Sequence, residues 1–193
     1  MDTTSTIRLE PHEIAFLRGG PRAAVTVAVL TLHLRGAVGP GRPATMRTTG
    51  ALNDPEQAVP ALTKAVHSAL YRTAGMGQLL ERQGVRSALT EVRRGLRAAG
   101  LLRAFPPGPT WTARRTLRSL RARDPLPESR TGLTNDELLL AVALYGDQAL
   151  TSLVPRFARA AGLVGRAGTT ELELRPGWGA TGGSGDGGGC GMA

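Results

Sequence analysis

The sequence predicts a mainly α-helical single domain with short β-hairpins, and three observations support this fold class. Of its 193 residues, 41% are hydrophobic but only 4% aromatic, so the core must be built from Leu, Val and Ala, which favours packed helices. Apolar residues recur at helical spacing through most of the chain. The glycine-rich end cannot bury enough surface to fold. We therefore expect a flexible lead (1–8), a helical domain (9–174) and a disordered Gly-rich tail (175–193).

The first predicted helix begins at Pro11 and ends at the Gly-Gly-Pro breaker of residues 19–21. The proline of this breaker opens a second helix that is apolar on nearly all sides up to Leu34, as expected of a helix at the centre of a domain. Residues 37–49 then predict a small β-hairpin with its turn at residues 39–41.

The middle of the chain predicts three further helices. Asp54 is a suitable N-cap for a helix over residues 54–72. A short helix follows at residues 78–83. Residues 85–99 carry a single apolar stripe at i, i+4, i+7 and i+11, which predicts a longer amphipathic helix.

The last part of the chain predicts three more helices. Thr110 can cap a helix whose apolar side faces inward and whose arginines face outward. A capping box from Thr134 to Glu137 opens the next helix. A final helix is predicted over residues 149–161, and the alternation at residues 170–174 is typical of an edge strand.

A weak internal repeat links three predicted helix ends. Each has a glycine followed by an apolar pair, with the glycines at Gly36, Gly100 and Gly162. A helix, a C-terminal glycine with positive φ and an apolar pair entering a strand make a winged-helix-like unit, although many other helices end in the same way. The second copy predicts a hairpin near residues 101–105.

The basic residues are gathered in one segment. Of 24 basic residues, 23 are Arg, and Lys64 is the single Lys. Residues 82–123 contain eleven Arg and one acid, Glu91, so this segment carries +10 while the rest of the chain is about neutral. A local field of this kind attracts the phosphates of nucleic acid or of lipid headgroups.

Two of the predicted helices place arginines at helical spacing opposite their apolar stripes. These arginines are the candidate anion-binding residues, for lipid or nucleic acid: Arg86, Arg93, Arg94, Arg97, Arg114, Arg118 and Arg121. The alternative is that these arginines reflect a general preference of this chain for Arg and lie on solvated helix faces without a ligand.

The sequence predicts no metal, cofactor or catalytic site. Its three histidines lack ligand spacing, and Lys64 follows no glycine-rich phosphate loop. No Ser/His/Asp or Cys/His grouping supports an enzyme.

Cys190, the single cysteine, excludes an internal disulfide and indicates a reducing compartment. Its C-terminal position only superficially matches a prenylation box. Uncharged apolar stretches fall short of the length that crosses a bilayer.

The block EPHEIAFLRGGPRAAV at residues 10–25 resembles the opening of an uncharacterised actinobacterial family whose members often end in a Gly- and Cys-rich tail. Residues 142–150 resemble that family's second marker. Many members carry additional hydrophobic spans and are regarded as membrane proteins. This chain differs from them because we expect no such span in it. The family implies no activity and no site residues. More faintly, the order of elements resembles the Golgi phosphoprotein type of helical domain, which binds anionic phosphoinositide headgroups at membrane surfaces.

Three hypotheses for function stay open. The first is a cytoplasmic, non-enzymatic binding module that docks its Arg-rich face on anionic lipid at the inner membrane face. The second is a winged-helix-like DNA-binding regulator with residues 85–99 as its recognition helix. The third is a protein-interaction adaptor without an anionic ligand. The oligomeric state does not follow from the sequence.

Overall fold

The computed structural model describes residues 9–52 and 59–164. Within these residues the chain forms eight helices and two antiparallel two-stranded hairpins, which confirms the mainly helical fold class. The predictions for the lead (1–8), the edge strand (170–174) and the Gly-rich tail (175–193), together with Cys190, lie outside the described residues.

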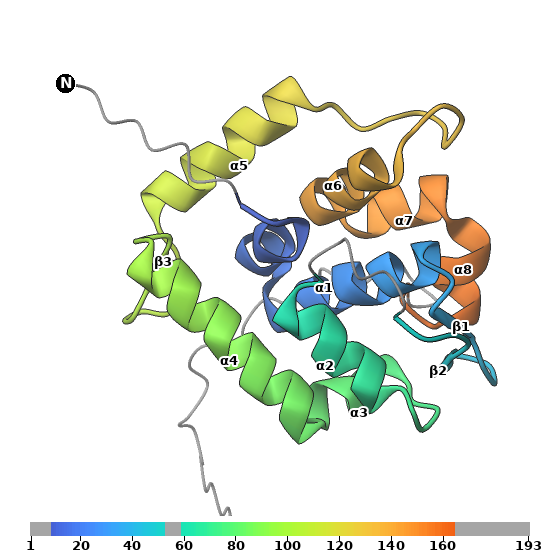
Figure 1. Ribbon diagram of the computed structural model, residues 1–193. Helices are drawn as coiled ribbons and strands as arrows, with labels where there is room; N and C mark the ends of the chain where they lie inside the picture. Colours follow the sequence, from blue (N-terminus) through green and yellow to red (C-terminus); the bar gives the residue numbers. More distant parts are fainter. Residues whose placement is uncertain (1–8, 53–58, 165–193) are drawn as a thin grey trace, which may run out of the picture.

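Helix α1 (Pro11–Leu34) lies at the centre, and the other helices surround it (Figure 1). The two helices predicted on either side of residues 19–21 form this one element with a kink between them. Gly19 and Gly20 have non-helical backbone angles, and the φ of Gly20 is 72°. Beyond the kink almost every side chain between Ala23 and Leu32 is buried, in agreement with the apolar pattern.

Helix α1 is also long and apolar enough to cross a membrane by length and composition alone, with a mean hydropathy of 1.2. The core helix of a soluble protein and a signal sequence meet the same criterion. In this fold 67% of the qualifying window is buried inside the domain. The helix is therefore weak evidence about membrane spans.

The first predicted hairpin is present as β1 (Val38–Pro40) and β2 (Met46–Thr48). Its turn lies after β1 rather than at the predicted glycine-proline step. Helix α2 (Ala61–Ala69) starts later than predicted, because Pro60 is its N-cap residue and has extended backbone angles. The predicted cap, Asp54, lies outside the described residues.

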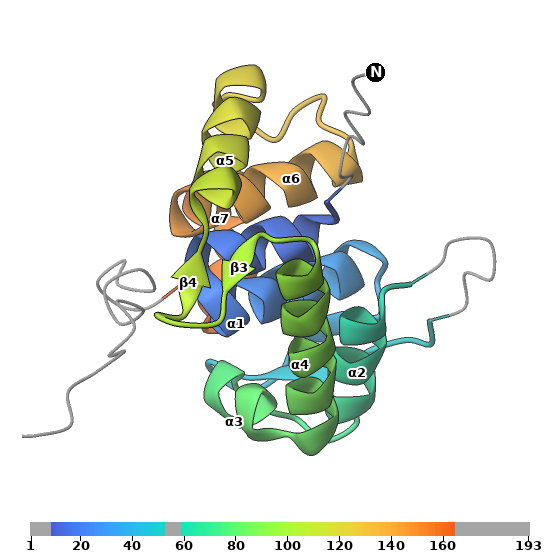
Figure 2. The same cartoon turned by 90° about the vertical axis from the view of Figure 1, so that its left-hand side faces the viewer.

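Helices α3 (Met76–Glu81) and α4 (Gln83–Ala98) follow one another with only Arg82, which has extended backbone angles, between them. Helix α4 confirms the long amphipathic helix. The second predicted hairpin is formed by β3 (Leu102–Arg103) and β4 (Gly108–Pro109). Helix α4, this hairpin and α5 lie in succession on one side of the molecule (Figure 2).

Two predicted caps hold the starts of α5 (Trp111–Arg123) and α6 (Asn135–Tyr145). The hydroxyl of Thr110 accepts a hydrogen bond from the third residue of α5 at 3.2 Å. At α6 the backbone N–H and the hydroxyl of Thr134 both donate to the Glu137 carboxylate at 2.8 Å. These hydrogen bonds stabilise the charged carboxylate and lower the pKa of Glu137.

The single helix predicted over residues 149–161 is wrong, because the structure has two short helices, α7 (Asp147–Leu153) and α8 (Pro155–Ala160). Pro155 lacks an N–H group and disfavours helical angles in the residue before it. Val154 accordingly has φ −137° and ψ 49°. A proline that can only begin a helix here divides the predicted one.

The three helix ends of the sequence repeat share one backbone structure. Gly36, Gly100 and Gly162 have φ of 71°, 68° and 65°, and each end has the two hydrogen bonds of a Schellman motif. The apolar residue after each glycine is buried. In the first two copies a threonine at the end of the hairpin, Thr49 or Thr110, is hydrogen-bonded to this turn. Its N–H and its hydroxyl each donate to a backbone carbonyl oxygen of the turn.

Candidate anion-binding site

The predicted arginines of α4 divide into two groups. At 100° per residue, Arg86, Arg93 and Arg97 lie along one flank of the helix, beside its buried stripe. Arg94 lies on the outward face, where its guanidinium donates to both carboxylate oxygens of Glu91 at 2.7 Å. The single acid of the basic segment therefore neutralises Arg94, whereas the flank arginines form no ion pair with a described residue.

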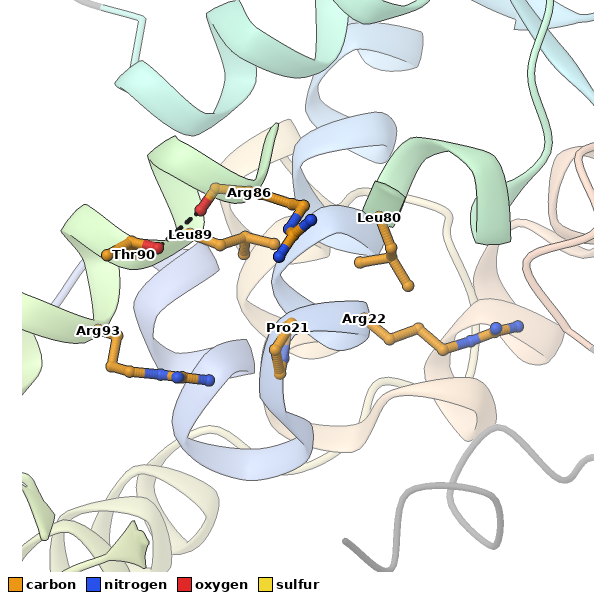
Figure 3. A pocket seen from close by; sticks show the side chains of 7 residues that line it. All are labelled: Pro21, Arg22, Leu80, Arg86, Leu89, Thr90 and Arg93. Carbon is orange, nitrogen blue, oxygen red and sulfur yellow. Dashed lines mark hydrogen bonds between the residues drawn. The ribbon is translucent and has the colours of Figure 1, made fainter. Parts of the chain in front are cut away.

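The arginine-bearing flank of α4 faces the kink of α1, where a first cavity of about 550 Å³ opens. We call it the Arg86 cavity. Figure 3 shows the guanidinium groups of Arg86 and Arg93 pointing into the space over Pro21, whereas that of Arg22 is turned away. The lining residues are Pro21, Arg22, Leu80, Arg86, Leu89, Thr90 and Arg93.

A second cavity of about 530 Å³ lies between the kink, the C-terminal end of α4, the β3–β4 hairpin and the start of α5. We call it the hairpin cavity. Its walls are apolar and proline-rich, and its basic residues are Arg18, Arg93, Arg97, Arg103 and Arg114. Together the two linings contain seven arginines and, among the described residues, no Asp or Glu.

Two of these arginines are held in place by the core. The Nε of Arg18 donates to the carbonyl oxygen of Ala143, near the C-terminal end of α6, at 2.8 Å. The guanidinium of Arg93 lies 5.9 Å from the ring centre of the buried Phe16, a cation–π distance. The site thus has fixed cations at its inner wall and exposed cations on α4 and α5.

The structure places Arg121 and Arg118 away from both cavities. The guanidinium of Arg121 donates to the carbonyl oxygen of Leu144 through Nε at 3.1 Å and Nη2 at 2.8 Å, and it lies 5.9 Å from the Tyr145 ring centre. Arg121 therefore caps the C-terminal end of α6. Arg118 is exposed on α5 and lines neither cavity.

The fold thus brings four of the seven predicted residues to the cavities and adds three that sequence analysis missed. Arg86, Arg93, Arg97 and Arg114 line the cavities, and Arg94, Arg118 and Arg121 do not. The added residues are Arg18, Arg22 and Arg103. The first two of these flank the Gly-Gly-Pro breaker, which was the available signal.

Two large aromatic side chains are exposed in the segment that forms the β3–β4 hairpin and the start of α5. Phe105, in the loop between β3 and β4, is 90% exposed, and Trp111, the first residue of α5, is 61% exposed. The Arg115 guanidinium lies 5.4 Å from the Trp111 ring centre. The described residues expose one other side chain of this kind, Tyr71, between α2 and α3. Neither Phe105 nor Trp111 lines the hairpin cavity itself, but both are close in sequence to residues that do.

A third cavity, of about 960 Å³, lies between α1, α2, α5 and α6 and has a mixed lining that includes the acids Glu10 and Asp136. Desolvation of His12 in this lining lowers the pKa of its imidazole, and Glu13 and Glu10 oppose the shift. In residues 9–52 and 59–164 no three His, Cys, Asp or Glu side chains are grouped so that they could hold a metal ion.

Comparisons of the chain with protein-family models, with curated proteins and with solved structures found no match. The resemblances to the actinobacterial family and to the Golgi phosphoprotein type of domain therefore stay predictions.

Proposed function

We propose that this protein is a non-enzymatic binding module that docks on anionic membrane lipid through the Arg86 cavity and the hairpin cavity. The observation that carries this proposal is the gathering of arginines in two adjoining concave linings that contain, among the described residues, no Asp or Glu. Arg22 is turned away and Arg18 donates to the Ala143 carbonyl. The candidate phosphate ligands are therefore Arg86, Arg93, Arg97, Arg103 and Arg114. Guanidinium groups present forked N–H donors that match phosphate oxygens. Arg94 differs from these arginines, because it lines neither cavity and is neutralised by Glu91.

The exposed aromatic residues favour a membrane as the source of the phosphate. Aromatic side chains are enriched at the interface between lipid headgroups and acyl chains, and Trp is prominent among them. Phe105 and Trp111 are exposed, and they belong to the hairpin and the helix start that also supply lining residues of the hairpin cavity, so a headgroup in this cavity would hold this segment near the bilayer surface. Each basic residue near an anionic leaflet contributes about 1 kcal/mol, which is enough for salt-sensitive adhesion.

DNA binding is the second candidate, because α3, α4 and the β3–β4 hairpin follow one another in the order of a winged helix. A recognition helix must present its outward face to base edges. On α4 this face carries the Glu91–Arg94 pair, and the unpaired arginines are turned toward α1. The lipid hypothesis fits this arrangement better.

The test is binding of the full chain to phosphatidylcholine vesicles with and without about 20 mol% phosphatidylglycerol, at low and at physiological salt. Duplex DNA is run beside them. We expect binding only to the acidic vesicles, a steep loss of binding with salt, and weaker binding of DNA. A preference for DNA would support the regulator hypothesis, and failure to bind either ligand at low ionic strength would support the adaptor hypothesis.

A further inference from the structure

We infer that the two cavities act together on a headgroup that carries two phosphates joined by a short linker, as in cardiolipin. This inference rests on the proposed lipid-binding function and names the class of lipid. The first observation is that the Arg86 cavity and the hairpin cavity are of similar volume, about 550 and 530 Å³, and share Pro21 and Arg93 in their linings. They are therefore two adjoining sites with one cation between them.

The spacing of the arginines along α4 matches two anions better than one. With a rise of 1.5 Å per residue, Arg86 and Arg93 attach about 10 Å apart along the helix axis, and Arg97 lies about 6 Å further. Arg86 lines only the first cavity and Arg97 only the second. A single phosphate is too small to engage both ends of this row.

The position of Arg93 supports a bridging role. Its guanidinium points over Pro21 toward the same space as that of Arg86 (Figure 3), and it also belongs to the hairpin cavity with Arg97 and Arg114. A guanidinium has five N–H donors, so Arg93 can donate to a phosphate on each side.

The charge distribution points the same way. Each cavity holds more than one cation and, among the described residues, no acid. One phosphate in the Arg86 cavity would leave Arg97, Arg103 and Arg114 of the hairpin cavity without a counterion, and one in the hairpin cavity would leave Arg86 without one. Two phosphates on one linker neutralise both sets of arginines. Once the first phosphate is bound, binding of the second is intramolecular, and this raises the overall affinity.

The test compares vesicles with equal phosphate charge: about 10 mol% cardiolipin against about 20 mol% phosphatidylglycerol, both in phosphatidylcholine. We expect the full chain to bind the cardiolipin vesicles at least about tenfold more tightly. Arg86→Gln should abolish this preference while binding to phosphatidylglycerol falls only a few-fold, because the hairpin cavity stays intact. Arg94→Gln, the matched control on the same helix, should change neither value.

Equal binding of the wild type to the two vesicles would overturn the two-phosphate inference and leave the proposed function standing. A cardiolipin preference that survives in Arg86→Gln would also overturn it, because the Arg86 cavity would then hold no phosphate. Absence of binding to both vesicles would overturn the inference together with the proposed function. Thermal unfolding of each variant shows that its fold is intact, as expected for two exposed side chains.

Discussion

Alanine substitutions at the glycines of two equivalent helix ends should separate backbone strain from crowding. At Gly100 the φ is 68° and a methyl group would meet nothing within 4 Å, so Gly100→Ala should cost only the left-handed backbone penalty of about 1–2 kcal/mol. At Gly162 the φ is 65°, but a methyl group would lie 2.8 Å from the Cβ of Ala44. Crowding of this kind typically adds about 1–3 kcal/mol.

The matched control is Gly95, which lies inside α4 with open space around it and no positive φ. Gly95→Ala should stabilise the helix by about 0.5–1 kcal/mol. For a domain of this size 1 kcal/mol shifts the Tm by about 2–4 °C.

Thermal unfolding followed by circular dichroism should therefore rank the Tm values as Gly95→Ala, wild type, Gly100→Ala and Gly162→Ala, from highest to lowest. A Gly100→Ala protein as stable as the wild type would refute the left-handed turn. A Gly162→Ala protein no less stable than Gly100→Ala would refute the close contact between the first hairpin and the end of α8.

Three further predictions concern the helix starts and the hairpin loop. Burial lowers the pKa of His12, so stability should decrease as the pH falls below about 6.5 toward this lowered pKa, and His12→Gln should flatten that part of a Tm-against-pH curve; an unchanged slope would exclude His12 as its source. Thr134→Ala removes the N-cap hydroxyl of α6 and should cost about 1 kcal/mol in urea unfolding, whereas Thr134→Ser should retain most of the stability. Phe105→Ser should leave the Tm unchanged, because the ring is 90% exposed, but should weaken vesicle sedimentation several-fold; undiminished sedimentation would remove Phe105 from the docking surface.

Local features of the fold were predictable because the relevant groups are close in sequence. The capping box joins Thr134 and Glu137 across three residues, and the glycine ends combine a helical stripe with the next apolar residue. The division between α7 and α8 was also visible in the sequence, since Pro155 fixes it.

The site itself was only partly predictable. Helical spacing grouped Arg86, Arg93 and Arg97 in one row, but it set this row opposite the apolar stripe. The row instead lies beside the stripe and faces the kink of α1. That arrangement depends on tertiary packing, which also brings in Arg18 and Arg103. Nor did spacing alone reveal that Arg121 is bound to a carbonyl of α6.

The most direct test of the proposed site compares two neighbouring residues that carry the same charge. Arg93 lines both cavities, whereas Arg94 is paired with Glu91 on the outward face, so Arg93→Gln and Arg94→Gln lower the net charge equally. Binding to acidic vesicles at low salt should fall at least several-fold in Arg93→Gln and stay near the wild-type value in Arg94→Gln. Equal losses in the two variants would show that only overall charge matters and would contradict a built phosphate site.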